Sequence, residues 1–107
     1  MMGFVFRLIP PRRDFPVTMS EGERATMIAH ADYWASLAAR GTALAYGPVH
    51  DPEGSYGIAI FRAEGQAEAE MVRDADPALS SPHGFGSEIM PTLSLVTTDA
   101  RYAALVS

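Results

Sequence analysis

The sequence predicts one α+β domain in which two helices cover one face of a four-stranded antiparallel sheet. Hydrophobic residues alternate with a period of two in four segments and recur at helical spacing in two others. These segments follow one another in the order βαββαβ, and right-handed crossovers then give a ferredoxin-like sandwich. A chain of 107 residues has the size of a single domain, so we assign 1–107 to one domain, with 98–107 as a possible C-terminal tail.

The first strand is predicted over residues 4–9, because Phe4, Phe6 and Leu8 alternate with the residues between them. Two prolines follow directly and end the strand, since proline cannot donate to a β-ladder. Residues 10–19 are therefore predicted to be a loop.

The first helix is predicted from a capping box, because Ser20 and Glu23 have the S-x-x-E spacing that satisfies free amide groups at a helix start. We expect it to run to Arg40, with Gly41 in the left-handed stop position. Its apolar side should face the sheet. The predicted apolar stripe contains Met27, Ala31, Trp34, Ala35 and Ala38, with His30, Tyr33 and Leu37 on its border and Asp32, Ser36 and Arg40 opposite.

The remaining elements are predicted from the same patterns and from turn residues. They are a strand over 42–46 ended by Gly47-Pro48, a turn over 50–54, a strand over 56–62, a helix over 66–75, a loop over 78–88, a strand over 89–97 and a weakly helical tail over 99–107. Pro77 ends the second helix, and Pro91 indicates a strand start or an edge strand.

The strands are apolar on both faces, although helices cover only one. In the first strand Val5 and Ile9 oppose Phe4, and in the third Ile58 opposes Phe61. A large uncovered apolar sheet face is unusual for a monomer. We therefore predict a homodimer in which two sheets pack face to face.

Composition excludes several classes of chemistry. Eight basic and thirteen acidic residues give a net charge of −5, which argues against nucleic acid or an anionic membrane as a partner. The chain has no Cys and no Lys, so disulfides, thiolate catalysis and Schiff-base lysines are excluded. No apolar run reaches the ~18–20 residues that span a bilayer. The charges near the N-terminus follow its apolar stretch, unlike those of a secretory signal, so we expect a cytoplasmic protein.

Short motifs in the middle of the chain resemble a known family. The motifs are, in order, His30-Ala-Asp-Tyr-Trp34, Gly41, Ala45-Tyr-Gly-Pro-Val-His-Asp-Pro-Glu-Gly54, Gly57, Asp74-Ala-Asp-Pro77 and Glu88-Ile-Met-Pro91. Their order and spacing over about 4–97 resemble the short single-domain branch of the YCII-related (YciI-like) family. The resemblance implies a dimeric α+β barrel, in agreement with the fold and the dimer predicted above.

The resemblance also implies two catalytic residues. The family has a histidine in its first helix and an aspartate before a proline after its second, and these fall on His30 and Asp76. Histidine titrates near neutral pH and suits general acid–base catalysis, and the aspartate would orient it. A relative in the family is a dehydrochlorinase that acts on a chlorinated hydroxyquinol. The structural alternative is a half-buried histidine at a helix edge and an Asp-Pro helix exit, where the helix dipole disfavours the negative charge of Asp76.

Further residues are candidates for a binding site. The predicted substrate-binding residues are Tyr33, Tyr46, Gly47, Pro48 and Asp51, of which Gly47 and Pro48 match the Gly-Pro turn of the family. The alternatives are core packing of Trp34 with Tyr46 as a strand residue, and a turn role for Asp51. Arg12 and Arg13 suit either an anionic substrate or a solvated loop.

A metal site is a further hypothesis, because His50 and His83 could converge with His30. Their spacing matches no metal motif, so we predict neither metal nor cofactor.

The predicted function is that of a small-molecule enzyme of the lyase, dehydrohalogenase or isomerase type, acting on a small aromatic or lactone-like compound. No G-x-S-x-G motif surrounds the serines, which favours proton transfer over covalent catalysis. The first alternative is a non-catalytic ligand-binding or accessory protein, and the second, from fold analogy alone, is a cofactor-independent oxygenase. Contact between His30 and Asp76 beside a closed pocket favours the enzyme, whereas separated residues in an open groove favour binding.

Overall fold

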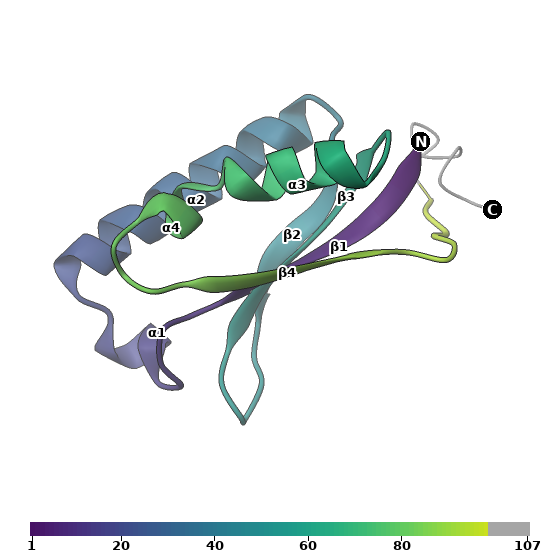
Figure 1. The fold of residues 1–107 in the computed structure, drawn as a ribbon. Helices are drawn as coiled ribbons and strands as arrows, with labels where there is room; N and C mark the ends of the chain where they lie inside the picture. The colour runs from purple at the N-terminus through teal and green to yellow at the C-terminus, as the bar shows by residue number, and fades with distance from the viewer. Residues whose placement is uncertain (99–107) are drawn as a thin grey trace.

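Four antiparallel strands form one sheet with the order β2-β3-β1-β4 (Figure 1). The strands are β1 (Met2–Ile9), β2 (Ala43–Val49), β3 (Tyr56–Ala63) and β4 (Gly86–Pro91). The helices are α1 (Phe15–Thr18), α2 (Glu21–Ala39), α3 (Gln66–Asp74) and α4 (Pro77–Ser80). The computed structural model describes residues 1–98, so the tail predicted over 99–107 lies outside the described residues.

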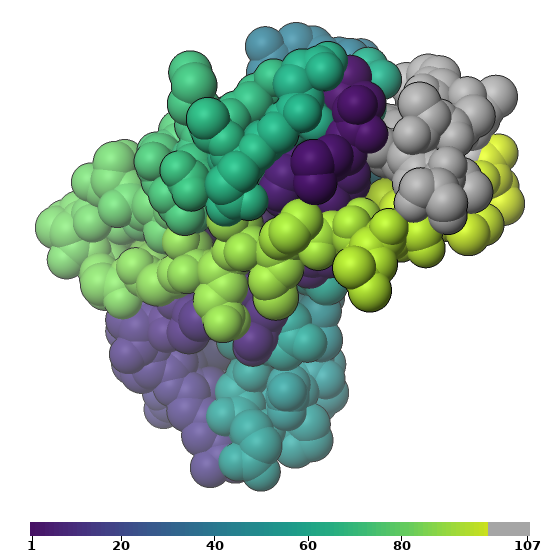
Figure 2. All heavy atoms as spheres, turned by 45° about the vertical axis from the view of Figure 1, so that its right-hand side comes forward, coloured from purple at the N-terminus to yellow at the C-terminus, as the bar shows by residue number. Residues whose placement is uncertain are grey.

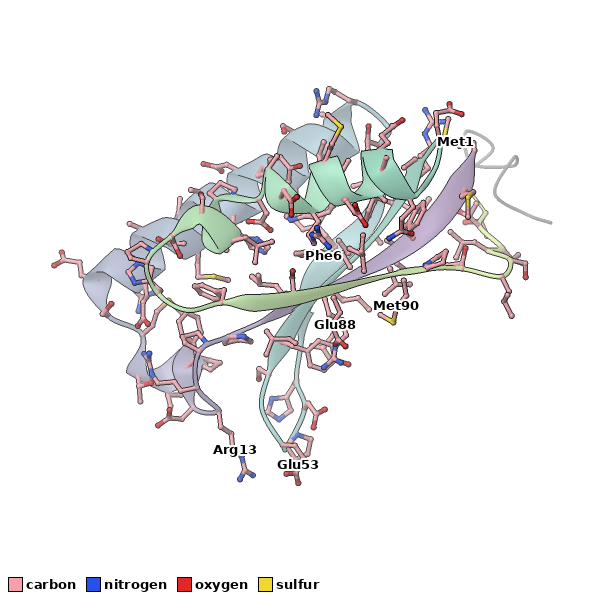
Figure 3. All side chains as sticks on the ribbon, viewed as in Figure 1. Met1, Phe6, Arg13, Glu53, Glu88 and Met90 are labelled. Carbon is pink, nitrogen blue, oxygen red and sulfur yellow. The ribbon has the colours of Figure 1, made fainter. Side chains whose placement is uncertain are left out.

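The helices α2, α3 and α4 lie over the same face of the sheet (Figure 1). Phe6 lies between β1 and these helices, whereas Glu88 and Met90 point to the other side of β4 (Figure 3). The core fills the space between the two layers. Its largest apolar side chains, all fully buried, are Trp34, Phe4, Phe6, Phe61 and Leu8. The predicted α+β, ferredoxin-like architecture is confirmed.

The predicted boundaries of the first long helix are confirmed in α2, but its predicted apolar stripe is correct only in part. Met27, Trp34 and Ala38 lie in or against the core, whereas the other two stripe residues do not. Ser20 and Glu23 form the capping box, and Gly41 has a φ of 80° after the last turn. Ala31 and Ala35, predicted to face the sheet, are exposed, whereas Leu37 is buried beside Trp34. Alanine buries little surface, so the larger side chains decide which side of the helix packs. His30, predicted on the border of the stripe, lies on the packed side.

Two predicted loops contain short helices. α1 lies within the predicted loop 10–19, where Phe15 is buried and packs edge to face on Phe85 at 5.3 Å. α4 lies at the start of the predicted loop 78–88. A four-residue helix makes about one turn, which is too short for hydrophobic periodicity to show.

Two strands differ from their predicted ranges. β2 continues through the predicted break at Gly47-Pro48, where Pro48 pairs with Gly57. β2 is an edge strand, so the missing proline N–H can face away from the ladder. β4 begins at Gly86 and ends at Pro91, because it pairs with β1 only as far as Phe4. Pro91 therefore closes this strand instead of opening it, whereas the predicted edge strand is confirmed, because β4 lies at the edge of the sheet.

The segment that carries α1 and the β2–β3 hairpin project side by side at one end of the molecule (Figure 2). Arg13 and Glu53 mark this end (Figure 3), and Arg13 Nη2 donates to the carbonyl of Pro52 at the hairpin tip, at 2.8 Å. This contact ties the two projections together.

Within residues 1–98 no helix is long and apolar enough to cross a membrane. The cytoplasmic location stays a prediction.

Candidate active site

His30 and Asp76 lie in direct contact, although they are 46 residues apart in the sequence. His30 projects from the middle of α2, and Asp76 sits in the short link between α3 and α4. The distance from His30 Nδ1 to Asp76 Oδ2 is 2.7 Å. Asp76 is fully buried, and the His30 side chain keeps 14% of its surface exposed. The carboxylate is thus sealed in the core, while part of the imidazole remains open.

Three donors converge on the Asp76 carboxylate. Trp34 Nε1 donates to Oδ2 at 2.8 Å, and the backbone N–H of Ala78 donates to Oδ1 at 2.9 Å. His30 Nδ1 is the third. An indole N–H only donates and an ionised carboxylate only accepts, so this network assigns the proton to Nδ1. A neutral His30 then carries its free electron pair on Nε2.

Asp76 also caps a helix, which corrects the expected effect of the helix dipole. α3 ends at Asp74, and Asp76 is the N-cap of α4, where its side chain accepts from Ala78. A carboxylate at a helix N-terminus is favoured, not disfavoured. Pro77 follows as the first residue of α4 and needs no donor partner there.

A pocket of about 270 Å³ lies beside His30. Its walls come from β1, from the α1 segment, from α2 and from the β2–β3 hairpin. The lining residues are Leu8, Pro10, Phe15, Pro16, Met19, Met27, His30, Ala31, Tyr46, Gly47, Pro48, Ser55, Tyr56 and Gly57. Apart from His30, this lining has no ionisable group other than the two tyrosine hydroxyls. The pocket is therefore mainly apolar, with the imidazole as its basic group.

The free nitrogen of His30 lies near the sheet at the floor of this pocket. A Cβ placed on Gly57 would come within 4.0 Å of His30 Nε2. Nδ1 is held by Asp76, so the two ring nitrogens have separate surroundings. One nitrogen is fixed in the core, and the other is available to a ligand. This arrangement suits proton transfer between Nε2 and a bound molecule.

The structure brings three of the five predicted substrate-binding residues to the pocket, namely Tyr46, Gly47 and Pro48. Tyr33 lies outside the lining, because its hydroxyl donates to the carbonyl of Val72 in α3. Burial raises the pKa of Tyr33, and the nearby Asp76 charge adds to this effect, so its hydroxyl stays neutral as a structural donor. Its ring packs edge to face on Trp34 at 5.4 Å.

Asp51 also lies outside the pocket lining. It accepts from the backbone N–H of Glu53 at 2.9 Å, which is the turn role considered as its alternative. Asp51 and His50 border a separate surface hollow near Arg13. Among residues 1–98 no three His, Asp or Glu side chains are grouped closely enough to hold a metal. The predicted absence of metal and cofactor stays a prediction.

Arg12 lies outside the pocket lining, and its guanidinium is bound within the fold. Its two terminal nitrogens donate to both Glu23 oxygens at 2.8 and 2.7 Å, and its Nε donates to Thr18 at 2.7 Å. The structure therefore gives Arg12 a role that the sequence did not predict, as the ion-pair partner of Glu23. The bidentate bond from Arg12, followed by the backbone N–H of Ser20, lowers the pKa of the Glu23 carboxyl from 4.5 to about 2.

Sequence reasoning missed several residues of the site. Trp34 was expected in the core, but its role as a donor to Asp76 was not foreseen. Phe15 and Met19 line the pocket from a segment predicted to be a plain loop. The one available signal was Pro16 at the first turn of a helix, a position where proline is common.

Comparisons with known proteins agree with this fold. The model of the YCII-related domain matches residues 4–92, so the chain belongs to the YCII-related family. No curated protein sequence matches significantly.

Nine chains of solved structures match this chain, and two of them are as follows. One is 5-chloro-2-hydroxyhydroquinone dehydrochlorinase (TftG) from Burkholderia phenoliruptrix AC1100 in complex with 2,5-dihydroxybenzoquinone, with a TM-score of 0.63 and 18% identity over 87% of this chain and 95% of that chain. The other is the NE2512 protein from Nitrosomonas europaea, with a TM-score of 0.41 and 20% identity over 92% of this chain and 96% of that chain. At these identities the likeness to the dehydrochlorinase shows the shared fold alone.

Proposed function

We propose that this protein is a small-molecule enzyme in which His30 transfers a proton at Nε2 and Asp76 orients the imidazole. The observation that carries the proposal is the 2.7 Å contact between Nδ1 of His30, a residue that lines the pocket, and a fully buried carboxylate. The carboxylate fixes the tautomer and stabilises the imidazolium that forms when Nε2 takes a proton. The reaction class is a lyase, dehydrohalogenase or isomerase step.

A dehydrochlorination illustrates the chemistry. On a chlorinated hydroquinone, Nε2 first takes the proton of one ring hydroxyl group and the imidazolium delivers it to the chlorine-bearing carbon, which gives the keto tautomer. Nε2 then takes the proton of a second hydroxyl group. The electron pair of this O–H bond forms a C=O bond, a ring double bond shifts, and chloride leaves with its bonding pair. In an isomerisation the imidazolium would likewise return the proton to another atom of the substrate. The dehydrochlorinase with the same fold supports a hydroxylated ring as the type of compound to try first.

The test is chloride release from 5-chloro-2-hydroxyhydroquinone by three variants. His30→Ala removes the base, and Asp76→Asn removes the charge that supports the imidazolium, so each should lower kcat by about 10²- to 10⁴-fold. Asp32→Asn is the matched control, because it makes the same chemical change on an exposed position of α2 two residues from His30. It should keep wild-type turnover.

Two results would count against the proposal. Full turnover by folded His30→Ala would remove the histidine from the mechanism. Binding of the compound by the wild-type protein without chloride release would favour a non-catalytic binding protein, an alternative that the mainly apolar pocket also fits.

The proposed assembly is a homodimer formed through the sheet face that the helices leave open. Val5, Ile58 and Ile60 are only half-buried there, and Met90 is 41% exposed. The Arg7–Glu88 ion pair, at 2.9 Å, lies among them. A second copy would cover these apolar side chains and place the polar pair inside the interface.

Sedimentation equilibrium at micromolar concentration should give about twice the chain mass of 11.5 kDa. Ile60→Glu should shift the protein towards monomer, because it places a charge in the apolar face. Ile28→Glu, at a 59% exposed position of α2, is the control and should leave the dimer intact. A wild-type monomer under these conditions would show that the assembly is wrong.

A further inference from the structure

Side chains on the helix-facing side of β3 become smaller towards the pocket. They are Phe61, then Ala59, then Gly57, at alternate positions of the strand. Phe61 and Ala59 fill the core and are buried, whereas Gly57 lines the pocket. The pocket therefore begins at Gly57, the position of β3 that has no side chain.

The missing side chain of Gly57 leaves space directly under the free nitrogen of His30. Gly57 pairs with Leu8 on one side and Pro48 on the other, so it is the centre of a three-strand row on the pocket floor. A Cβ built on Gly57 would lie 4.0 Å from His30 Nε2 and 3.4 Å from Leu8 Cβ. A ligand that occupies this space would lie in van der Waals contact with the imidazole, from where its acidic group can approach Nε2 more closely.

The size and lining of the pocket limit what can fill this space. An apolar cavity of about 150 Å³ is large enough for benzene. The pocket here measures about 270 Å³, which suits one substituted ring. The lining has no Arg, Asp or Glu, and the Arg12 guanidinium is engaged by Glu23. An ionised ligand would lose its hydration there and would meet only the His30 imidazole, whose Nδ1 already binds the buried Asp76 carboxylate.

We propose that Gly57 is the specificity-determining residue of this pocket, which takes an uncharged, flat molecule of about one substituted ring against the Gly57 backbone. The acidic group of the ligand then points at His30 Nε2. This inference rests on the proposed function for the role of His30 and adds the substrate class and the residue that selects it.

The experiment is a heteronuclear NMR titration of the full chain with two matched probes, hydroquinone and para-hydroxybenzoate at neutral pH. The His30 ring signal, assigned by its loss in His30→Ala, reports binding. Hydroquinone should shift this signal, and para-hydroxybenzoate should bind at least about tenfold more weakly, because its carboxylate must be desolvated.

Substitutions at Gly57 test the selecting residue. Gly57→Ala should weaken hydroquinone binding about tenfold or more, the usual effect of one misplaced methyl group in a fitted pocket, and Gly57→Val should abolish it. The added methyl group meets Leu8 at an ordinary contact distance, so Gly57→Ala should fold even where Gly57→Val does not. Gly65→Ala is the control, because a Cβ at this glycine meets nothing within 4 Å.

Three results would overturn the inference: no wild-type binding of hydroquinone, equal binding of the two probes, or wild-type affinity in folded Gly57→Ala. Because these are binding measurements, they can fail while proton transfer by His30 holds. They can also succeed where chloride release fails, so the two proposals are judged separately.

Discussion

Glu23 and Asp76 are the two buried carboxylates within residues 1–98, and they serve different purposes. Both join α2 to a remote part of the chain: Glu23 holds the α1 segment through Arg12, and Asp76 holds α4 against His30 and Trp34. Glu23 is bound by groups that are permanently charged or part of the backbone. Of the three groups that bind Asp76, the His30 imidazole is one that can gain and lose a proton.

The two sites differ in what else the partner of the carboxylate contacts; this partner is Arg12 for Glu23 and His30 for Asp76. The Arg12 guanidinium also donates to Thr18, so the contact ends within the fold. The His30 imidazole instead presents a second nitrogen to a pocket. A buried carboxylate paired with arginine fixes a segment, whereas one paired with a half-buried histidine can support proton transfer. The partner, not the burial of the acid, separates the two roles.

The largest expected effect comes from Asp76→Ala. This change removes the acceptor of three donors, leaves the fully buried Trp34 N–H unpaired and removes the cap of α4. We expect the free energy of unfolding to fall by about 3 kcal/mol, measured by urea denaturation. Asp76→Asn keeps a side-chain oxygen and should lose less. A loss of under about 1 kcal/mol in Asp76→Ala would mean that the network is not structural.

The sequence predicts the outline of the fold well because its signals are local. The period-two pattern of Phe4, Phe6 and Leu8 identifies β1, and the capping box and Gly41 mark both ends of α2. The side that α2 presents to the sheet is not local information. It depends on which large side chains fit the core. Alanines such as Ala31 and Ala35 count as apolar in the sequence pattern, although they are exposed in the structure.

The candidate site is less predictable because it depends on that same orientation. The contact between His30 and Asp76 forms only when α2 turns His30 towards the link before Pro77. The family resemblance pointed to this pair, whereas the residues alone left it open. The pocket walls at Phe15 and Met19 come from a segment without periodicity, and β4 takes its length from pairing with β1.

The smallest expected effect concerns the acid stability of the other carboxylate. The hydrogen bonds from Arg12 and Ser20 lower the pKa of Glu23 in the folded protein to about 2, whereas the unfolded chain should titrate near 4.5. The unfolded state therefore takes up a proton first as the pH falls. The stabilisation from ionised Glu23 is fully present above about pH 4.5 and is lost progressively as the pH falls towards about 2.

Denaturation curves of wild type and Glu23→Gln should differ in midpoint at neutral pH, and the two midpoints should converge as the pH falls over this range. If the midpoints of the two proteins differ by the same amount from neutral pH down to about 2, the proposed role of the Arg12 contact is contradicted. Glu23→Gln should keep wild-type turnover, unlike the variants of the Asp76 network.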